Sequence, residues 1–195
     1  MNPAFACEKW FKALNIEKKK DCESICRTSQ VDMSSYMCTN QCDILCKGSL
    51  KNEAKNYYGL TDDEIKFCKE NTIKCALAYK QSWIAEKTCL EIYPYSATND
   101  ESDACRHYVW AILLCRELNL NDAEIVLNAH ENNEIEPKNQ KAMDLANNRL
   151  ALINYQKNSK TFQDFEGIKK SFIQEMKNNK FIVIEPKYSS SKGIP

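Results

Sequence analysis

The sequence predicts an all-α protein, a disulfide-stapled helical bundle with at most one short C-terminal strand, and three observations support this prediction. Only 4 of the 195 residues are glycine, whereas sandwiches, barrels and nucleotide-binding folds need glycine at turns and phosphate loops. Long stretches carry apolar residues three and four positions apart, which is the period of a helix face. The 11 cysteines are far more than usual and indicate disulfide staples.

The cysteines and the net charge narrow the class of protein. The chain has no C-x2-C pair and only 2 histidines, so disulfides explain the cysteines better than metal clusters do. Disulfides imply export, and because the stretch after Met1 lacks the apolar region of a signal peptide, we expect a secreted or periplasmic mature form. The formal net charge of 0 disfavours nucleic acid as a partner. We expect no transmembrane segment, because no apolar run is long enough, and no cofactor or metal.

The cysteines also divide the chain, because none lies in its last 80 residues. They stand at positions 7, 22, 26, 38, 42, 46, 68, 75, 89, 105 and 115. We therefore expect a disulfide-stapled helical hairpin region over residues 1–60, a helical core with the candidate site over 61–186, and a disordered tail over 187–195.

The first expected element is a hairpin of two helices. Cys22 and Cys26 are four residues apart, as are Cys38 and Cys42, and this spacing places each pair on one helix face. An antiparallel arrangement would link Cys22 with Cys42 and Cys26 with Cys38. A slip of one turn, which would use Cys46, remains an alternative.

The next expected helix begins at a capping box. Thr61 and Glu64 have the spacing at which each side chain accepts a hydrogen bond from the other residue's backbone N–H. The apolar period then continues to about Tyr93, where a proline follows. Cys68 and Cys75 would lie two turns apart on this one helix, too far to bond to each other, so each should reach a different neighbour.

The rest of the chain predicts helices separated by turns. Asp100 or Ser102 caps a helix that is apolar almost all round, and such a helix is usually central and buried. The further elements are helices near 121–129, 140–156 and 161–178, a loop over 132–139, and a strand-like run over 181–184.

One polar constellation contains both histidines of the chain. Asp103 and His107 are four residues apart on the buried helix, where the carboxylate can orient the imidazole and raise its pKa. Asp144 and Asn148 have the same spacing on a later helix. The remaining members are Arg106, His130, Glu131 and Asn147. We expect a pocket that holds a general acid or base with hydrogen-bonding amides. The structural alternative is a satisfied core histidine, a solvated helix end and surface amides.

The same residues carry a resemblance to a known pattern. Asp103-Ala-Cys-Arg-His107, Ala129-His-Glu131 and Met143-Asp-Leu-Ala-Asn-Asn148 occur in this order. They resemble the DAxRH…AHE…MDxxNN pattern of an uncharacterised bacterial helical domain found in secreted and toxin-associated proteins. The resemblance covers residues 103–150 and implies a site there, without a settled activity. That domain often has glycine after the asparagine pair, where this chain has Arg149-Leu-Ala151, which puts in doubt a close approach of the backbone to a ligand.

The first functional hypothesis is a secreted hydrolase that acts on a cell-envelope polymer, such as a peptidoglycan glycan strand. Glu131 or Glu134 would be the acid and Asp144 the base or stabiliser, as in two-carboxylate glycoside cleavage. In a lipid or amide hydrolase, His107 would be the base, oriented by Asp103. A metal-assisted version would use both histidines together with an acid as ligands.

The second hypothesis is a non-enzymatic binding or structural protein, whose disulfide hairpin presents a surface to a protein partner. A serine hydrolase is disfavoured because G-x-S-x-G is absent, and a cysteine nucleophile would require an unpaired Cys105. A hydrolase requires the segments around 103, 130 and 144 to converge, whereas a binding protein does not.

Overall fold

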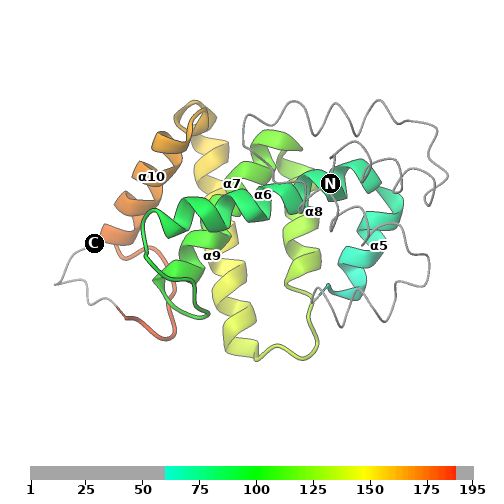
Figure 1. Cartoon of the computed structure of the whole chain (residues 1–195), viewed down its shortest axis with the longest axis horizontal. Coiled ribbons are helices and arrows are strands. Elements are labelled where there is room, and N and C mark those ends of the chain that lie inside the picture. The colour runs from blue at the N-terminus through cyan, green and yellow to red at the C-terminus, as the bar shows by residue number, and fades with distance from the viewer. Residues whose placement is uncertain (1–59, 188–195) are drawn as a thin grey trace, which may run out of the picture. The chain divides into compact units, whose positions relative to one another are not determined.

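A computed structural model describes residues 60–187, and this part of the chain is all-α, as predicted. Six α-helices and one short 3-10 helix follow one another without a strand in the described range (Figure 1). Their bounds are α5 Asp62–Glu70, α6 Thr72–Leu90, α7 Glu101–Glu117, α8 Leu120–His130, α9 Lys138–Lys157, η1 Ser159–Phe162 and α10 Phe165–Lys177. None of these helices has the length and apolar character needed to cross a membrane.

The chain divides into two units, residues 1–79 and 80–195. In the described part of the first unit, α5 starts at the predicted capping box. The Thr61 hydroxyl accepts from the Glu64 N–H at 3.0 Å, and Glu64 Oε2 accepts from the Thr61 N–H at 2.8 Å. Leu60 and Ile65 are buried together, and Tyr79 packs against them.

The prediction of one continuous helix up to Tyr93 was wrong. The helix breaks at Asn71, whose backbone leaves the helical region at φ −136° and ψ 56°, and α6 begins at the next residue. Because the chain turns there, Cys68 and Cys75 come within 4.9 Å of each other at Cα and form a disulfide. The prediction that each of these cysteines reaches a different neighbour was therefore also wrong.

Helix α7 is the centre of the second unit, as its all-round apolar sequence predicts. It packs against α8, α9 and α10 (Figure 1), and most of its side chains are buried. A disulfide between Cys89 and Cys105 joins the last turn of α6 to α7. Cys115, also on α7, is buried and is the free cysteine among the described residues.

Helices α8, α9 and α10 follow the predicted order, with shifted ends. Asn119 caps α8 and Asp164 caps α10, each with a side-chain oxygen that accepts a backbone N–H. Gly167 in the first turn of α10 lies so close to the Thr161 carbonyl that a Cβ would collide with it. This close approach explains why glycine stands at that helix position.

An aromatic cluster forms the core between α7 and α10. Phe172 is fully buried, and its ring lies 6.0 Å from Tyr108 and 4.9 Å from Phe181, measured between ring centroids. Tyr93 contacts Phe172 edge-on at 6.2 Å. Phe181 begins the run that was predicted to be strand-like, but the run has no strand partner in the described range; the side chain of Asn147 and the carbonyl of Asn99 bind its backbone instead.

The predicted N-terminal hairpin lies outside the described residues, and so do its expected links between Cys22 and Cys42 and between Cys26 and Cys38. The expected tail also lies outside them, except for its first residue, Lys187. The Lys187 ammonium lies 2.9 Å from Asp100 Oδ2, and the backbone N–H of Lys187 donates to Glu101 at 3.1 Å.

Candidate functional site

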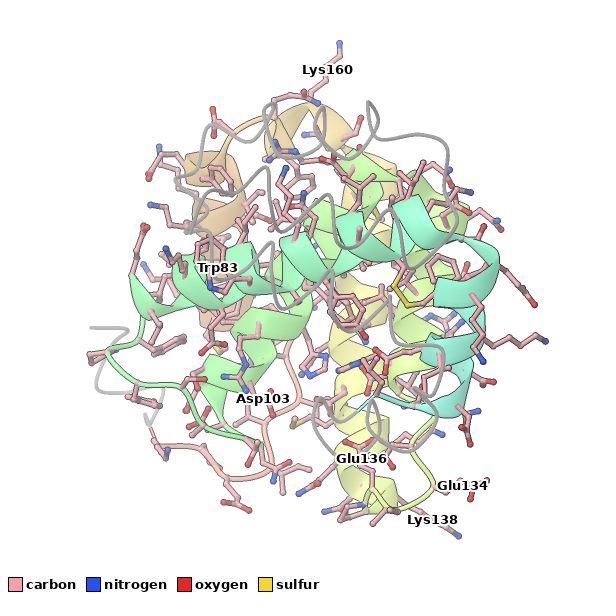
Figure 2. The ribbon with its side chains drawn as sticks, turned by 45° about the vertical axis from the view of Figure 1, so that its right-hand side comes forward. Trp83, Asp103, Glu134, Glu136, Lys138 and Lys160 are labelled. Carbon is pink, nitrogen blue, oxygen red and sulfur yellow. A yellow bond between two sulfur atoms is a disulfide. The ribbon has the colours of Figure 1, made fainter. Side chains whose placement is uncertain are left out.

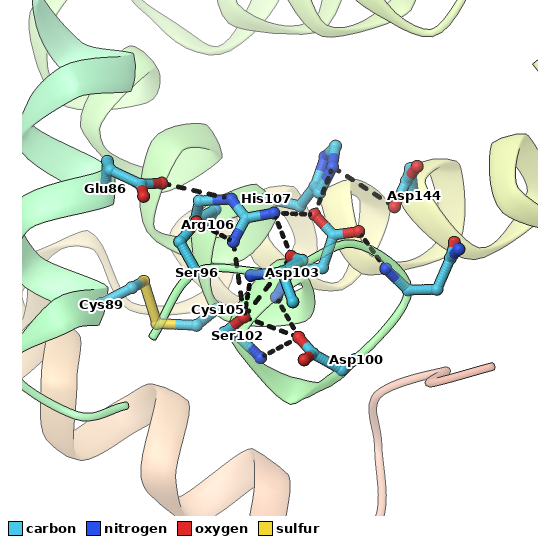
Figure 3. Close-up of polar contacts among 12 residues, drawn as sticks. Glu86, Cys89, Ser96, Asp100, Ser102, Asp103, Cys105, Arg106, His107 and Asp144 are labelled. Atoms are coloured by element: carbon cyan, nitrogen blue, oxygen red, sulfur yellow. Dashed lines mark hydrogen bonds and ion pairs between the residues drawn. A yellow bond between two sulfur atoms is a disulfide. The ribbon is translucent and has the colours of Figure 1, made fainter. Parts of the chain in front are cut away.

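The three segments predicted to carry the site converge in the second unit. Helix α7 supplies Asp103 and His107 from its first two turns, Glu131 caps the C-terminal end of α8, and α9 supplies Asp144 and Asn148. Figure 3 shows the carboxylates of Asp103 and Asp144 next to the same nitrogen of the His107 ring. This convergence is the structural requirement that the hydrolase hypothesis set.

The start of α7 is fixed by Asp100, which orients the residues that follow it. Asp100 Oδ1 accepts from the N–H groups of Ser102 and Asp103 at 2.9 and 3.2 Å, and from the Ser102 hydroxyl at 2.6 Å (Figure 3). With the helix start set in this way, Asp103 and His107 lie one turn apart on the same face. The predicted spacing thus places the carboxylate beside the imidazole.

His107 lies at the centre of three carboxylates that come from three different elements. Its Nδ1 is 3.3 Å from Glu131 Oε1, and its Nε2 is 3.3 Å from Asp144 Oδ1 and 3.6 Å from Asp103 Oδ1. The His107 side chain is 11% exposed, and the three carboxylates are exposed by less than that. Since both ring nitrogens face an acceptor, the protonated ring, which donates from both nitrogens, suits this position.

The electrostatics of the cluster favour that protonated ring. Burial lowers the pKa of His107, but the contact with Glu131 and the negative charges of Asp144 and Asp103 outweigh burial. The pKa of His107 therefore rises from 6.5 to about 9. At neutral pH the imidazole is a cation held between carboxylates.

The two acids nearest the ring are shifted in opposite directions. Burial raises the pKa of Asp144, the charges of Glu131 and Asp103 add to it, and His107 opposes them, so that the pKa reaches about 7. Burial also acts to raise the pKa of Glu131, but His107, His130 and the hydrogen bond from Asn148 lower it below its usual value. Glu131 is thus ionised at a pH at which Asp144 still carries a proton for part of the time.

One predicted site residue, Arg106, contacts Asp103 and the surroundings of Asp103 rather than the histidine. Arg106 Nη2 donates to Asp103 Oδ1 at 2.7 Å, and its Nε lies 3.3 Å from Glu86 on α6 (Figure 3). The same guanidinium donates to the Ala97 carbonyl at 2.6 Å. Arg106 therefore holds the loop before α7 through the Ala97 carbonyl and places a positive charge beside the Asp103 carboxylate.

The two neighbouring asparagines on α9 have different hydrogen-bond partners. Asn148 Nδ2 donates to Glu131 Oε1 at 2.8 Å, so this amide belongs to the cluster. Asn147 instead makes two hydrogen bonds to the backbone of Ile182, at 3.0 Å each. The prediction that both amides face the site therefore applies to Asn148, while Asn147 holds the C-terminal segment.

His130 and Glu134 lie at the margin of the cluster or outside it. His130 is exposed, and its ring lies 5.0 Å from Trp110 and 6.2 Å from His107 between centroids. Glu134 is exposed in the loop after α8 (Figure 2). Of the two acids considered for the same role, only Glu131 contacts the imidazole.

Sequence reasoning missed two residues, Glu136 and Asn99. Burial and the charge of Glu131 raise the pKa of Glu136, which is half-buried in the same loop (Figure 2). The Asn99 N–H donates to Asp103 Oδ2 at 2.6 Å. Neither residue lies on a helix, so no periodicity connects it to the site.

Two residue sets in the described range have donor atoms close enough for a divalent cation. Asp103, His107 and Asp144 form one set, and Glu131, Glu136 and Asp144 form the other, with one donor atom of each residue within 4.8 Å of the others. In the described part of the chain neither set includes His130. The candidate set that uses both histidines is therefore not supported by these positions.

A cysteine nucleophile is excluded at this place, because Cys105 is bonded to Cys89.

Comparisons with known proteins add one finding. Residues 65–180 match the family model described as Domain of unknown function (DUF6973). No curated protein and no solved structure matches the chain.

Proposed function

We propose that this chain, which belongs to the DUF6973 family, is a secreted or periplasmic hydrolase of a cell-envelope polymer, with a peptidoglycan glycan strand as its substrate class. The observation that carries the proposal is the position of two acids, Glu131 and Asp144, at the two nitrogens of the His107 ring, and the pKa values of these acids shift in opposite directions. Paired titratable groups whose environments separate their pKa values are the usual arrangement of an acid and a base in a hydrolase.

The pKa directions favour the reverse of the roles expected from sequence. Asp144, with a pKa of about 7, is the proton donor, and Glu131, with its lowered pKa, is the ionised partner. His107 keeps Glu131 ionised by its positive charge, and Asn148 orients the same carboxylate. The polar centre then has one residue in each role that two-carboxylate cleavage needs.

The spacing of the two acids favours one of the two known stereochemical courses. One carboxylate oxygen of Glu131 lies within 4.8 Å of one of Asp144, which is nearer to the roughly 5–5.5 Å of retaining glycosidases than to the roughly 6.5–9.5 Å of inverting ones. In the first step, Asp144 gives its proton to the departing glycosidic oxygen while the Glu131 carboxylate bonds to the anomeric carbon. In the second step, Asp144 takes a proton from the water that cleaves this ester, and both acids return to their starting forms.

The disulfides and the exposure of the cluster support the rest of the proposal. The Cys68–Cys75 and Cys89–Cys105 bonds suit an oxidising compartment, where an envelope polymer is within reach. Part of the cluster is accessible to solvent, because the His107 side chain is 11% exposed, and Glu136 and His130 are half-buried and exposed, respectively. A sugar would approach from this accessible part.

The experiment is release of reducing ends from purified peptidoglycan by the wild-type protein and by Glu131→Gln and Asp144→Asn. We expect each variant to lose about 10²–10⁴-fold in turnover, the usual contribution of a positioned acid or base. The matched control is Glu134→Gln, an exposed acid three residues from Glu131. Turnover should decline above about pH 7, as Asp144 loses its proton. Full turnover in Glu131→Gln, with an unchanged melting temperature, would refute the assignment.

A metal-assisted lipid or amide hydrolase is the second candidate, favoured by the two donor sets that share Asp144. Treatment with EDTA separates the candidates, because acid–base cleavage by Glu131 and Asp144 continues without a divalent cation. A non-enzymatic binding protein is the third reading, and the wild-type protein would then cleave neither glycan, lipid nor amide.

A further inference from the structure

We propose that the C-terminal segment Phe181–Lys187, called here the C-terminal strap, positions α7 and α9, the two helices whose acids face Nε2 of His107, and that Asn147 is its anchoring residue. The consequence for catalysis rests on the proposed function, whereas the consequence for His107 itself does not.

The strap is fastened to α9 by a side-chain amide. Asn147 Nδ2 donates to the Ile182 carbonyl, and Asn147 Oδ1 accepts from the Ile182 N–H, both at 3.0 Å. Asn147 is almost completely buried, whereas Ile182 is half exposed, so both bonds are partly shielded from water. Such a two-point contact fixes the orientation as well as the distance of the backbone it holds.

The other end of the strap is fastened to the start of α7. The Asn99 carbonyl accepts from the N–H groups of Ile184 and Glu185 at 3.0 and 2.9 Å. The Lys187 N–H donates to Glu101 at 3.1 Å, and the Lys187 ammonium lies 2.9 Å from Asp100. The strap thus reaches the residues that begin α7.

Asn99 connects this attachment directly to the site. While its carbonyl holds the strap, its N–H donates to Asp103 Oδ2 at 2.6 Å. Its backbone has φ 66°, a left-handed conformation that asparagine tolerates better than most residues. The conformation of this one residue therefore directs both contacts at once.

The strap joins the same two elements whose acids share one nitrogen of His107. Asp103 on α7 and Asp144 on α9 both face Nε2. Asn147 lies three residues after Asp144, one turn further along α9. When the strap is released, α7 and α9 lose the connection that the strap makes between them, and the carboxylates of Asp103 and Asp144 are free to move away from the ring.

A purely structural role is the competing explanation, because Phe181 packs its ring 5.3 Å from Tyr108 and 4.9 Å from Phe172. In that case the loss of Asn147 would lower stability but leave the surroundings of His107 unchanged. A measurement on the imidazole itself separates the two explanations.

The experiment is a pH titration of the His107 ring by NMR in the full chain, with Asn147→Ala. His130→Gln assigns the signals, since the chain has only 2 histidines. The matched control is Asn154→Ala on the same helix, which also loses two side-chain hydrogen bonds, to Tyr108 and Glu175. We expect Asn147→Ala to move the His107 pKa by about one unit towards 6.5, because a carboxylate neighbour shifts a pKa by about that much. Asn154→Ala should leave it in place.

A second variant keeps the test decisive if Asn147→Ala does not fold. Lys187→Ala removes the half-exposed ammonium at the other end of the strap, and it should move the His107 pKa in the same direction by a smaller amount. A His107 pKa equal in wild type, in Lys187→Ala and in any folded Asn147→Ala overturns the proposal. If the pKa moves but the wild-type protein cleaves no glycan, the strap stands and the proposed function fails. If the protein cleaves glycan and the pKa does not move, the reverse holds.

Discussion

Raising the pH from 6 to 9 should lower the free energy of unfolding by about 3 kcal/mol through His107. The folded pKa of His107 is about 9, against 6.5 for the ordinary imidazole. A difference of about 2.5 pH units, at about 1.4 kcal/mol for each, amounts to about 3.5 kcal/mol, of which about 3 kcal/mol is lost between pH 6 and 9. Because the folded state holds the proton more tightly, this stabilisation is complete below pH 6.5 and is lost as the pH rises through 9. Asp144 also holds its proton more tightly when folded, but its contribution is lost earlier, between about pH 4 and 7.

The assay is urea unfolding at half-unit steps between pH 6 and 9, on wild-type protein and on His107→Gln. The wild-type free energy of unfolding should fall by about 1.4 kcal/mol for each pH unit in the middle of this range, the slope of one bound proton. The slope should be smaller in His107→Gln, where only the proton held by Asp144 remains, and unchanged in His130→Gln, because His130 is exposed. Equal slopes in wild type and His107→Gln would refute the reasoning that carboxylates outweigh burial at this imidazole.

Two further predictions concern the packing around the site. Replacing both Cys89 and Cys105 by alanine should lower the free energy of unfolding by about 3 kcal/mol, the value for a closed loop of about 15 residues. Urea unfolding without reductant measures this loss. A loss no larger than that in Cys115→Ala would contradict a stabilising Cys89–Cys105 disulfide. Phe172→Ala should cost about 3–5 kcal/mol, since the ring is fully buried among aromatics, whereas the exposed Phe165→Ala should cost far less; similar melting temperatures of the two variants would contradict this packing.

The fold was largely predictable, because its signals are local. The predictions of helix rest on low glycine content, apolar periodicity and the capping box at Thr61 and Glu64, which reflect neighbouring residues only. The described helices confirm these predictions. The break at Asn71 was not predictable in the same way, because the apolar period continues across it. Because the backbone of this one residue is not helical, the chain turns and Cys68 and Cys75 come close enough to form a disulfide.

The candidate site was predictable in its members but not in their partners. Spacing of four placed Asp103 beside His107, and Asp144 on one face with Asn148. It could not tell that the neighbouring amide of Asn147 turns to Ile182, 35 residues away in the chain. Backbone contacts of that kind leave no pattern in the residue types.

The sequence by itself determined that this protein is helical, that α7 is its buried centre, and that both histidines stand among acids and amides. These properties follow from composition and from spacings within one or two helical turns. Only the tertiary structure decided which carboxylate faces which nitrogen of His107, why the pKa values of Glu131 and Asp144 move apart, and how the C-terminal strap ties α7 to α9. The physical reason is that charge interactions, burial and long-range hydrogen bonds depend on distances in space, which residues far apart in the chain acquire only when the helices pack.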